Sequence, residues 1–263
     1  MLQAIADRSR EQAREVIELA TGGSKAELLE YFSNEGDFSN SGSLRRGLLV
    51  AAGHGLALPD GDNEQPALQG ALLCGEWPGP GAPLADLLPD HRSSAADIEG
   101  QTDLSGRVAL FWSSFSAGTL RMEDDRLITG KAPCQIAPRP MISALAQRLL
   151  GQKAGGASAL IGMVQRAACF SLPESDQVLR SFQKVLENII TRLMSGYPVG
   201  AALDFFNQYY VELAVDLHVL READDLSPEH TRHVAEIAAA ARDARSFVVI
   251  GDPAARIPRD GLS

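Results

Sequence analysis

The chain has few cysteines, no excess of basic residues and no long apolar run, and each absence excludes a class of protein. The 263 residues include three cysteines, Cys74, Cys134 and Cys169, at spacings that form no C-x-x-C pair. Neither a disulfide framework nor a cysteine-based zinc site is therefore expected. The five histidines do not cluster with the cysteines. We accordingly expect no metal and no cofactor.

The charge of the chain is acidic, with 34 Asp and Glu against 24 Lys and Arg and a formal net charge of −10. A protein that binds nucleic acid through its phosphates needs a dense basic surface, so this balance argues against such a partner. No stretch approaches the ~18 apolar residues of a membrane span. The first eight residues end in the charged pair Asp7-Arg8 and form no apolar core, unlike a signal peptide. We therefore expect a cytoplasmic protein with no nucleic-acid or membrane partner.

Apolar runs of strand length alternate along the chain with segments of helical periodicity. Strands are expected at 47–52, 69–74, 107–113, 157–164 and 246–250, and helices at 3–20, 24–32, 139–151, 175–195, 199–222 and 227–244. Continuously apolar strands separated by helices are typical of a parallel sheet with helices on both faces. The sequence predicts an N-terminal helical segment over 1–46 and one α/β domain over 47–263. Because no helix separates it from 47–52, the 69–74 strand can instead be a peripheral hairpin.

Two of the expected strands end in side chains with catalytic chemistry. His54 follows the 47–52 strand within Gly53-His54-Gly55, and Ser114 follows the 107–113 strand. Open α/β sheets build their sites at the carboxyl ends of neighbouring strands. The sequence therefore predicts that His54 and Ser114 face one cleft.

These segments, taken in order, resemble the caspase-like (clan CD) peptidases, and most closely their CHAT branch. The likeness spans roughly residues 47–258 and is carried by Ala51–Leu56, Gln69–Leu73, Phe111–Thr119, Ile136–Pro140, Gly156–Gly162 and Phe247–Ile257. The resemblance implies a three-layer caspase-like sandwich. It also implies hydrolysis of peptide bonds by a histidine and a cysteine thiolate, with backbone N–H groups holding the oxyanion. Carried over, His54 is the catalytic histidine, Gly55 an oxyanion donor and Ser114 the nucleophile position.

The chain departs from the family pattern at the nucleophile itself. Ser114 stands where such a peptidase has cysteine, and Ser116 and Leu120 replace an expected glycine and proline. Met163 and Gln165 stand where His and Asp are expected. A serine hydroxyl is a far weaker nucleophile than a thiol that is already partly ionised. We therefore expect a thiol-protease-like hydrolase that is inactive or nearly inactive. Three explanations of the serine stay open: a natural pseudoenzyme, a cysteine that was replaced, and a different chemistry.

Two alternatives follow from these departures. The first is a non-catalytic interaction module that keeps the fold in order to bind a protein partner. The second is a serine hydrolase, because Ser114-Phe115-Ser116-Ala117-Gly118 nearly matches the G-x-S-x-G nucleophile elbow, with Ser116 as the nucleophile. That fold needs a later acid and histidine, and the 157–164 strand leads only to Gln165, while no histidine follows Asp252.

Three carboxylates are candidates for contacts with a polypeptide substrate. Asp60 and Asp62 follow His54 and could line a pocket for a basic side chain, or form a solvated acidic loop. Asp252, in Gly251-Asp252-Pro253, lies near the substrate cleft if the resemblance holds, and otherwise ends its strand in a turn. A caspase-like sheet also has two strands before the histidine strand, where residues 1–46 offer helices. A fragment, a reduced version and a part of a larger multidomain protein or complex therefore stay open.

Overall fold

The central sheet has five strands in the order β1-β2-β5-β10-β11. A computed structural model of the protein describes residues 16–19, 23–32, 47–168, 176–223, 225 and 227–257. Strands β1 (Val16–Leu19), β2 (Leu48–Ala52), β5 (Val108–Trp112) and β10 (Ala159–Met163) run parallel to one another. Strand β11 (Phe247–Gly251) runs antiparallel to β10. The protein is thus a mixed α/β fold with a mostly parallel sheet, as predicted.

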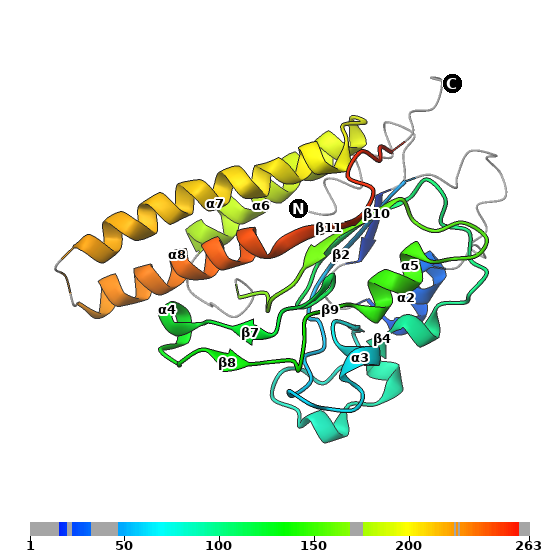
Figure 1. Ribbon diagram of the computed structural model, residues 1–263, viewed down its shortest axis with the longest axis horizontal. Coiled ribbons are helices and arrows are strands. Elements are labelled where there is room, and N and C mark those ends of the chain that lie inside the picture. Colours follow the sequence, from blue (N-terminus) through cyan, green and yellow to red (C-terminus); the bar gives the residue numbers. More distant parts are fainter. Residues whose placement is uncertain are drawn as a thin grey trace.

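The strands form where the sequence is continuously apolar, and alternate side chains pack on opposite faces of the sheet. Helices α6 (Asp176–Met194), α7 (Val199–Glu222) and α8 (Pro228–Ser246) share one apolar cluster with Val50, Leu110 and Ile161. Helices α2 (Lys25–Phe32) and α5 (Ala144–Leu150) share a second cluster with the alternate strand residues. Figure 1 shows these two groups of helices on opposite sides of the sheet. Both faces of the sheet are therefore covered.

The core on the α6–α8 face is rich in aromatic rings. Phe206 of α7 stacks on Phe247 of β11 with centroids 3.9 Å apart, and Trp112 at the end of β5 lies 4.7 Å from Phe182 of α6. Helices α7 and α8 continue beyond this core as a hairpin whose far end projects past the sheet (Figure 1). None of the helices in the described ranges is long and apolar enough to cross a membrane.

Short elements connect the main ones. They are α3 (Gln65–Leu68), β3 (Leu72–Leu73), β4 (Arg92–Ser93), β6 (Gly118–Thr119), β7 (Met122–Glu123), α4 (Arg126–Thr129), β8 (Cys134–Gln135) and β9 (Met141–Ile142), with 3-10 turns at Leu84–Asp86, Pro89–His91 and Ala95–Asp97. Strands β3 and β4, β6 and β9, and β7 and β8 form three separate antiparallel pairs.

The largest correction to the predicted elements is at the N-terminus. Residues 16–19, predicted to be helical, form β1 at the edge of the central sheet, so the interpretation of residues 1–46 as a helical segment is wrong at this point. Parallel pairing with β2 overrides the helical propensity of a segment rich in Glu and Leu. The remaining residues of the predicted 3–20 helix lie outside the described residues.

Two other predicted elements differ in extent. The 69–74 strand shortens to β3, which pairs with β4 outside the central sheet and is therefore a peripheral element. The 139–151 helix starts later, at Ala144, because residues 141–142 form β9 instead. The predicted helices at 24–32, 175–195, 199–222 and 227–244 correspond to α2, α6, α7 and α8.

Candidate functional site

The register of the central sheet brings the His54 and Ser114 loops together. Ala52 at the end of β2 pairs with Trp112 at the end of β5, and the Gly53 N–H donates to the Trp112 carbonyl (3.1 Å). His54 and Ser114 each lie two residues beyond this pair of strand ends. The two residues thus follow neighbouring parallel strands at one edge of the sheet. That their side chains face one cleft stays a prediction.

Gly55 packs against the Ser114 loop. A methyl group on its α-carbon would lie 2.8 Å from the carbonyl carbon and 3.0 Å from the nitrogen of Ser114. The backbone after His54 thus packs directly on the backbone of Ser114. Gly55 also forms an antiparallel bridge with Leu72, and the hydrogen bonds that flank this bridge use the N–H groups of Leu56 and Leu73. The Gly55 N–H takes no part in these two bonds. An oxyanion donor has to be uncommitted in this way.

Ser114 is partly buried at the start of a strained turn. The next residue, Phe115, has a φ of +60°, the only positive φ outside glycine in the described part of the chain. A bulky residue rarely adopts this left-handed conformation, and such strain is concentrated at functional sites. The turn is held by the Phe115 N–H, which donates to the Gln165 carbonyl (3.1 Å). The Ser114 Oγ accepts the N–H of Ala167 (3.0 Å).

His54 is partly buried against an aromatic ring. Its imidazole meets Trp77 edge to face, with centroids 5.1 Å apart. Burial lowers the pKa of His54, since the charged imidazolium loses hydration. The ring is therefore neutral near pH 7 and able to accept a proton, as a general base must.

Ser116 has a structural role, and its burial excludes the serine-hydrolase alternative. Its side chain is fully buried and lies within hydrogen-bonding distance of the carbonyls of Phe111 (3.1 Å) and Ser113 (2.9 Å), to which it donates. It also accepts the N–H of Met163 from the neighbouring strand β10 (3.0 Å). A hydroxyl held in this way ties β5 to β10 and cannot reach a substrate.

The two carboxylates predicted near His54 lie on the exposed loop before α3. Asp60 accepts a hydrogen bond from the side-chain amide of Gln135 in β8 (3.0 Å). Asp62 accepts the N–H of Glu64 (2.8 Å), where the chain turns into α3. These contacts fit the interpretation of a solvated acidic loop.

Asp252 lies at the amino ends of the parallel strands, whereas His54 and Ser114 lie at their carboxyl ends. Its predicted place beside the substrate cleft is therefore wrong. Because β11 runs antiparallel to β10, the end of β11 lies beside the start of β10, and the Asp252 N–H donates to the Ser158 carbonyl (3.0 Å). A five-residue strand, roughly 16 Å long, separates that edge from the one that carries Ser114. The carboxylate accepts the Ala254 N–H (2.8 Å), which is turn chemistry.

Charged residues that the sequence analysis missed hold the segment after β10, whose Ala167 N–H contacts Ser114. Glu123 at the end of β7 is buried and accepts a hydrogen bond from the Arg166 guanidinium (3.1 Å), which also lies over the Phe115 ring. The guanidinium of Arg242 in α8 pairs with Asp125 and donates to the Arg166 carbonyl (3.1 Å). No sequence motif links these residues, because they lie far apart along the chain.

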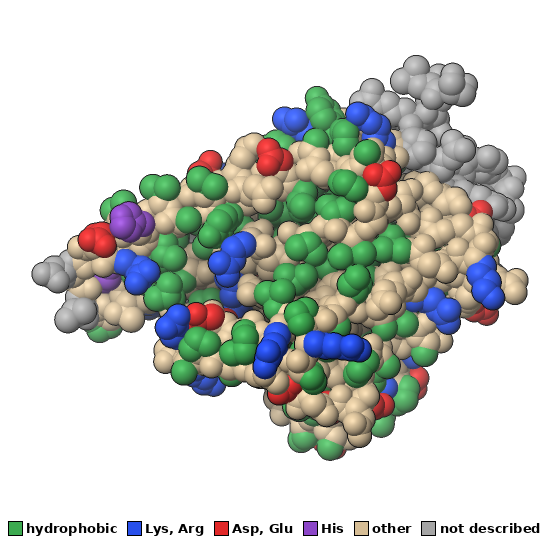
Figure 2. Space-filling view, viewed as in Figure 1, with side chains coloured by type: hydrophobic (Ala, Val, Ile, Leu, Met, Phe, Trp, Pro, Cys, Tyr) green, Lys and Arg blue, Asp and Glu red, His purple; other side chains and the backbone are tan. Residues whose placement is uncertain are grey.

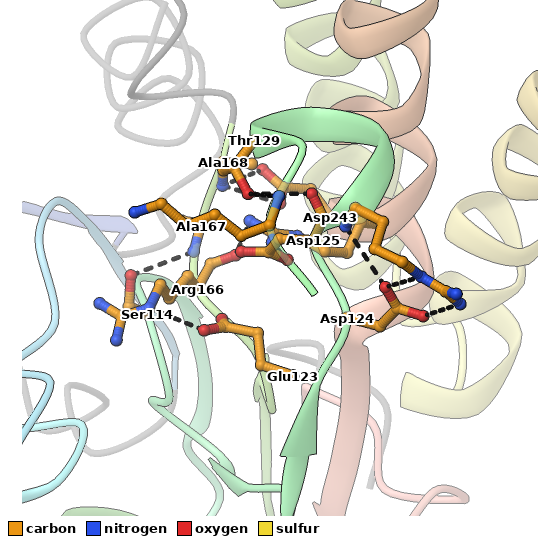
Figure 3. Close-up of polar contacts among 12 residues, drawn as sticks. Ser114, Glu123, Asp124, Asp125, Thr129, Arg166, Ala167, Ala168 and Asp243 are labelled. Atoms are coloured by element: carbon orange, nitrogen blue, oxygen red, sulfur yellow. Dashed lines mark hydrogen bonds and ion pairs between the residues drawn. The ribbon is translucent and has the colours of Figure 1, made fainter. Parts of the chain in front are cut away.

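Asp243 completes this cluster from α8. Its fully buried carboxylate accepts the N–H of Ala168 through both oxygens (2.8 and 3.0 Å). Residues 166–168 are thus held by Glu123, Arg242 and Asp243 together. Figure 3 shows Glu123 and Asp243 approaching this segment from different elements. This arrangement fixes the direction in which the Ala167 N–H points at Ser114.

Within the described ranges, the cysteines and the metal-binding side chains supply no further site. Cys74 is buried, and burial together with the nearby Glu76 carboxylate raises the pKa of its thiol to about 11. Cys134 is exposed, and Cys169 lies outside the described residues. Among the residues that the structure describes, no group of three His, Cys, Asp or Glu is placed to hold a metal ion.

In comparisons with known proteins, no family model, curated protein or solved structure matches the chain.

Proposed function

We propose that the chain is a caspase-like, CHAT-type peptidase domain whose nucleophile position is silent because Ser114 replaces cysteine. Its polypeptide substrate or partner would bind at the carboxyl edge of β2 and β5. The observation that carries the proposal is the contact of Gly55 with the Ser114 backbone, which puts His54 and Ser114 on register-matched strand ends. The parallel strands with helices on both faces support a three-layer caspase-like sandwich.

The surroundings of Ser114 suit a thiolate better than a hydroxyl. A neutral His54 can take the proton of a thiol, and the Ala167 N–H would stabilise the resulting anion, as hydrogen bonds to a charged form do. The Gly55 N–H would then donate to the carbonyl oxygen under attack. A serine hydroxyl ionises far less readily, so the same contacts leave it unreactive.

The alternative is a module that binds a polypeptide and has lost catalysis. The observation that favours it is the clamp on residues 166–168, in which the buried Glu123 and Asp243 hold this segment against Ser114. Such a clamp keeps a binding surface rigid whether or not a nucleophile is present. Gln165, buried beside Ser114, also brings a neutral amide to the place where the resemblance leads one to expect a carboxylate.

The experiment that separates the two is the Ser114→Cys variant, compared with Ser114→Ala. Its thiol should react with iodoacetamide with an apparent pKa below the ~8.5 of a free cysteine, and fluorogenic peptides should be cleaved. Adding His54→Ala should reduce cleavage roughly 10²–10⁴-fold, the contribution of a positioned general base. A reactive thiol without cleavage would favour the binding module. A thiol with an ordinary pKa and no cleavage would contradict the dyad.

A further inference from the structure

A groove lies between α4, α7 and α8, and none of its lining residues belongs to the His54 or Ser114 loops. Its volume is about 550 Å³, which is in the range of sites for small molecules. The lining residues of α7, and likewise those of α8, recur at intervals of three and four residues, so one face of each helix forms the groove. Figure 2 shows Lys and Arg side chains among hydrophobic ones over these helices.

Four arginines line the groove, and two of them are paired with carboxylates. Arg126 donates two hydrogen bonds to Asp124 (2.9 and 2.7 Å), and the buried Arg242 pairs with Asp125. Among the described lining residues, Asp124 is the single carboxylate. The other two arginines therefore bring positive charge that the groove does not neutralise, in a chain whose net charge is −10.

The first of these two, Arg245, is held in place at one end of the groove. Its guanidinium lies over the Tyr210 ring, 5.9 Å from the centroid, and makes no hydrogen bond to another described residue. A cation–π contact orients a guanidinium but satisfies none of its N–H donors. Hydrogen bonds from Arg126 lower the pKa of Asp124, and the nearby charge of Arg245 adds to this effect. One carboxylate thus serves two guanidinium groups, and the donors of Arg245 stay available to an anion.

The second, Arg221, lies at the opposite end. It is exposed and forms no ion pair with another described residue. Along α7 the rise from Tyr210 to Arg221 is roughly 16 Å at 1.5 Å per residue. The middle of the groove is apolar on both helices and is lined by Ala214, Leu217, Ala238 and Ala241. The groove therefore has an uncompensated positive charge at each end and an apolar floor between them.

We propose that this groove binds a small organic dicarboxylate whose two carboxylates are separated by an apolar spacer. One carboxylate would accept hydrogen bonds from Arg245 and the other from Arg221, since guanidinium groups bind carboxylates through paired N–H donors. The spacer would cover the apolar floor and remove it from water. Each end offers a single uncompensated charge, which matches a carboxylate better than the nearly double charge of a phosphate monoester. Because the groove and the proposed cleft at Ser114 share no lining residue, this proposal does not depend on peptidase function.

The test compares dodecanedioate with dodecanoate, which have the same chain length but carry two carboxylates and one. Each is titrated into isotope-labelled protein, and shifts of the arginine Nε–H resonances report both affinity and location. Dodecanedioate should bind at least about threefold more tightly than dodecanoate and shift the signals of Arg221 and Arg245, because a second charged pair forms. Succinate has the two charges without the spacer and should bind at least about threefold more weakly than dodecanedioate. Equal affinities for dodecanedioate and dodecanoate, or no binding of dodecanedioate, would overturn the proposal.

Variants then identify the two ends. Arg221→Gln and Arg245→Gln should each reduce the affinity for dodecanedioate about three- to tenfold, to the level that dodecanoate has on the unchanged protein. Lys184→Gln removes the same charge from an exposed residue of α6 outside the groove and should leave the affinity within about twofold. An equal loss with Lys184→Gln, or no loss with either arginine variant, would refute the site. So would inorganic phosphate or succinate binding as tightly as dodecanedioate, because the groove would then be a site for any anion.

Discussion

The contact between Gly55 and Ser114 can be tested by adding one methyl group. In Gly55→Ala the new β-carbon would lie 2.8 Å from the Ser114 carbonyl carbon and closer still to the carbonyl oxygen. Ordinary contact begins near 3.4 Å, so the two loops must separate by 0.6 Å or more. Both sides of the contact are backbone, and no flexible side chain can move aside.

The expected cost is that of overpacking, about 2–3 kcal/mol. For a chain of this size each kcal/mol lowers the melting temperature by roughly 2–4 °C, so Gly55→Ala should melt roughly 4–12 °C below the parent. Thermal unfolding followed by circular dichroism measures this change. In the Ser114→Cys background the displaced loop should also slow alkylation of the new thiol.

Gly81→Ala is the matched control, because a methyl group at Gly81 would meet no atom within 4 Å. That variant should be as stable as the parent or up to about 1 kcal/mol more stable, since alanine restricts the unfolded chain. If Gly55→Ala and Gly81→Ala melt together, the two loops do not pack as described. The proposed pairing of His54 with residue 114 would then fail.

Three further predictions concern single side chains. Ser116→Ala should lower the free energy of unfolding in denaturant by about 1–3 kcal/mol, because a buried N–H loses its acceptor. The same change should leave a thiol at position 114 reactive. Unchanged stability would contradict the structural role of Ser116. Burial lowers the pKa of His54, so as pH falls below about 6.5 the imidazole is protonated in the unfolded chain before it is protonated in the folded protein. Protonation of His54 therefore lowers the stability of the fold in acid. His54→Gln should therefore flatten the fall in stability between about pH 7 and about pH 5, and an unchanged slope would count against it. Iodoacetamide at about pH 8 should label exposed Cys134 much faster than Cys74, whose pKa is raised to about 11, and equal rates in peptide mass spectra would argue against that burial.

The sequence by itself determined most of the longer elements of this protein. Strands β2 and β5 and helices α6, α7 and α8 lie close to where apolar periodicity predicted them. Periodicity is a local property, set by which side chains must leave water within one segment. The same reasoning placed His54 and Ser114 after adjacent strands, because the carboxyl ends of parallel strands meet at one edge.

The tertiary structure alone decided the neighbours and directions of the strands. Backbone hydrogen bonds are the same for every sequence, so pairing between distant segments leaves little local signal. Strand β1 was missed for this reason, and the antiparallel direction of β11 moved Asp252 to the far edge. Two other features likewise depend on contacts between residues more than 40 positions apart. One is the burial of the Ser116 hydroxyl between β5 and β10. The other is the approach of Glu123 and Asp243 to the segment that faces Ser114.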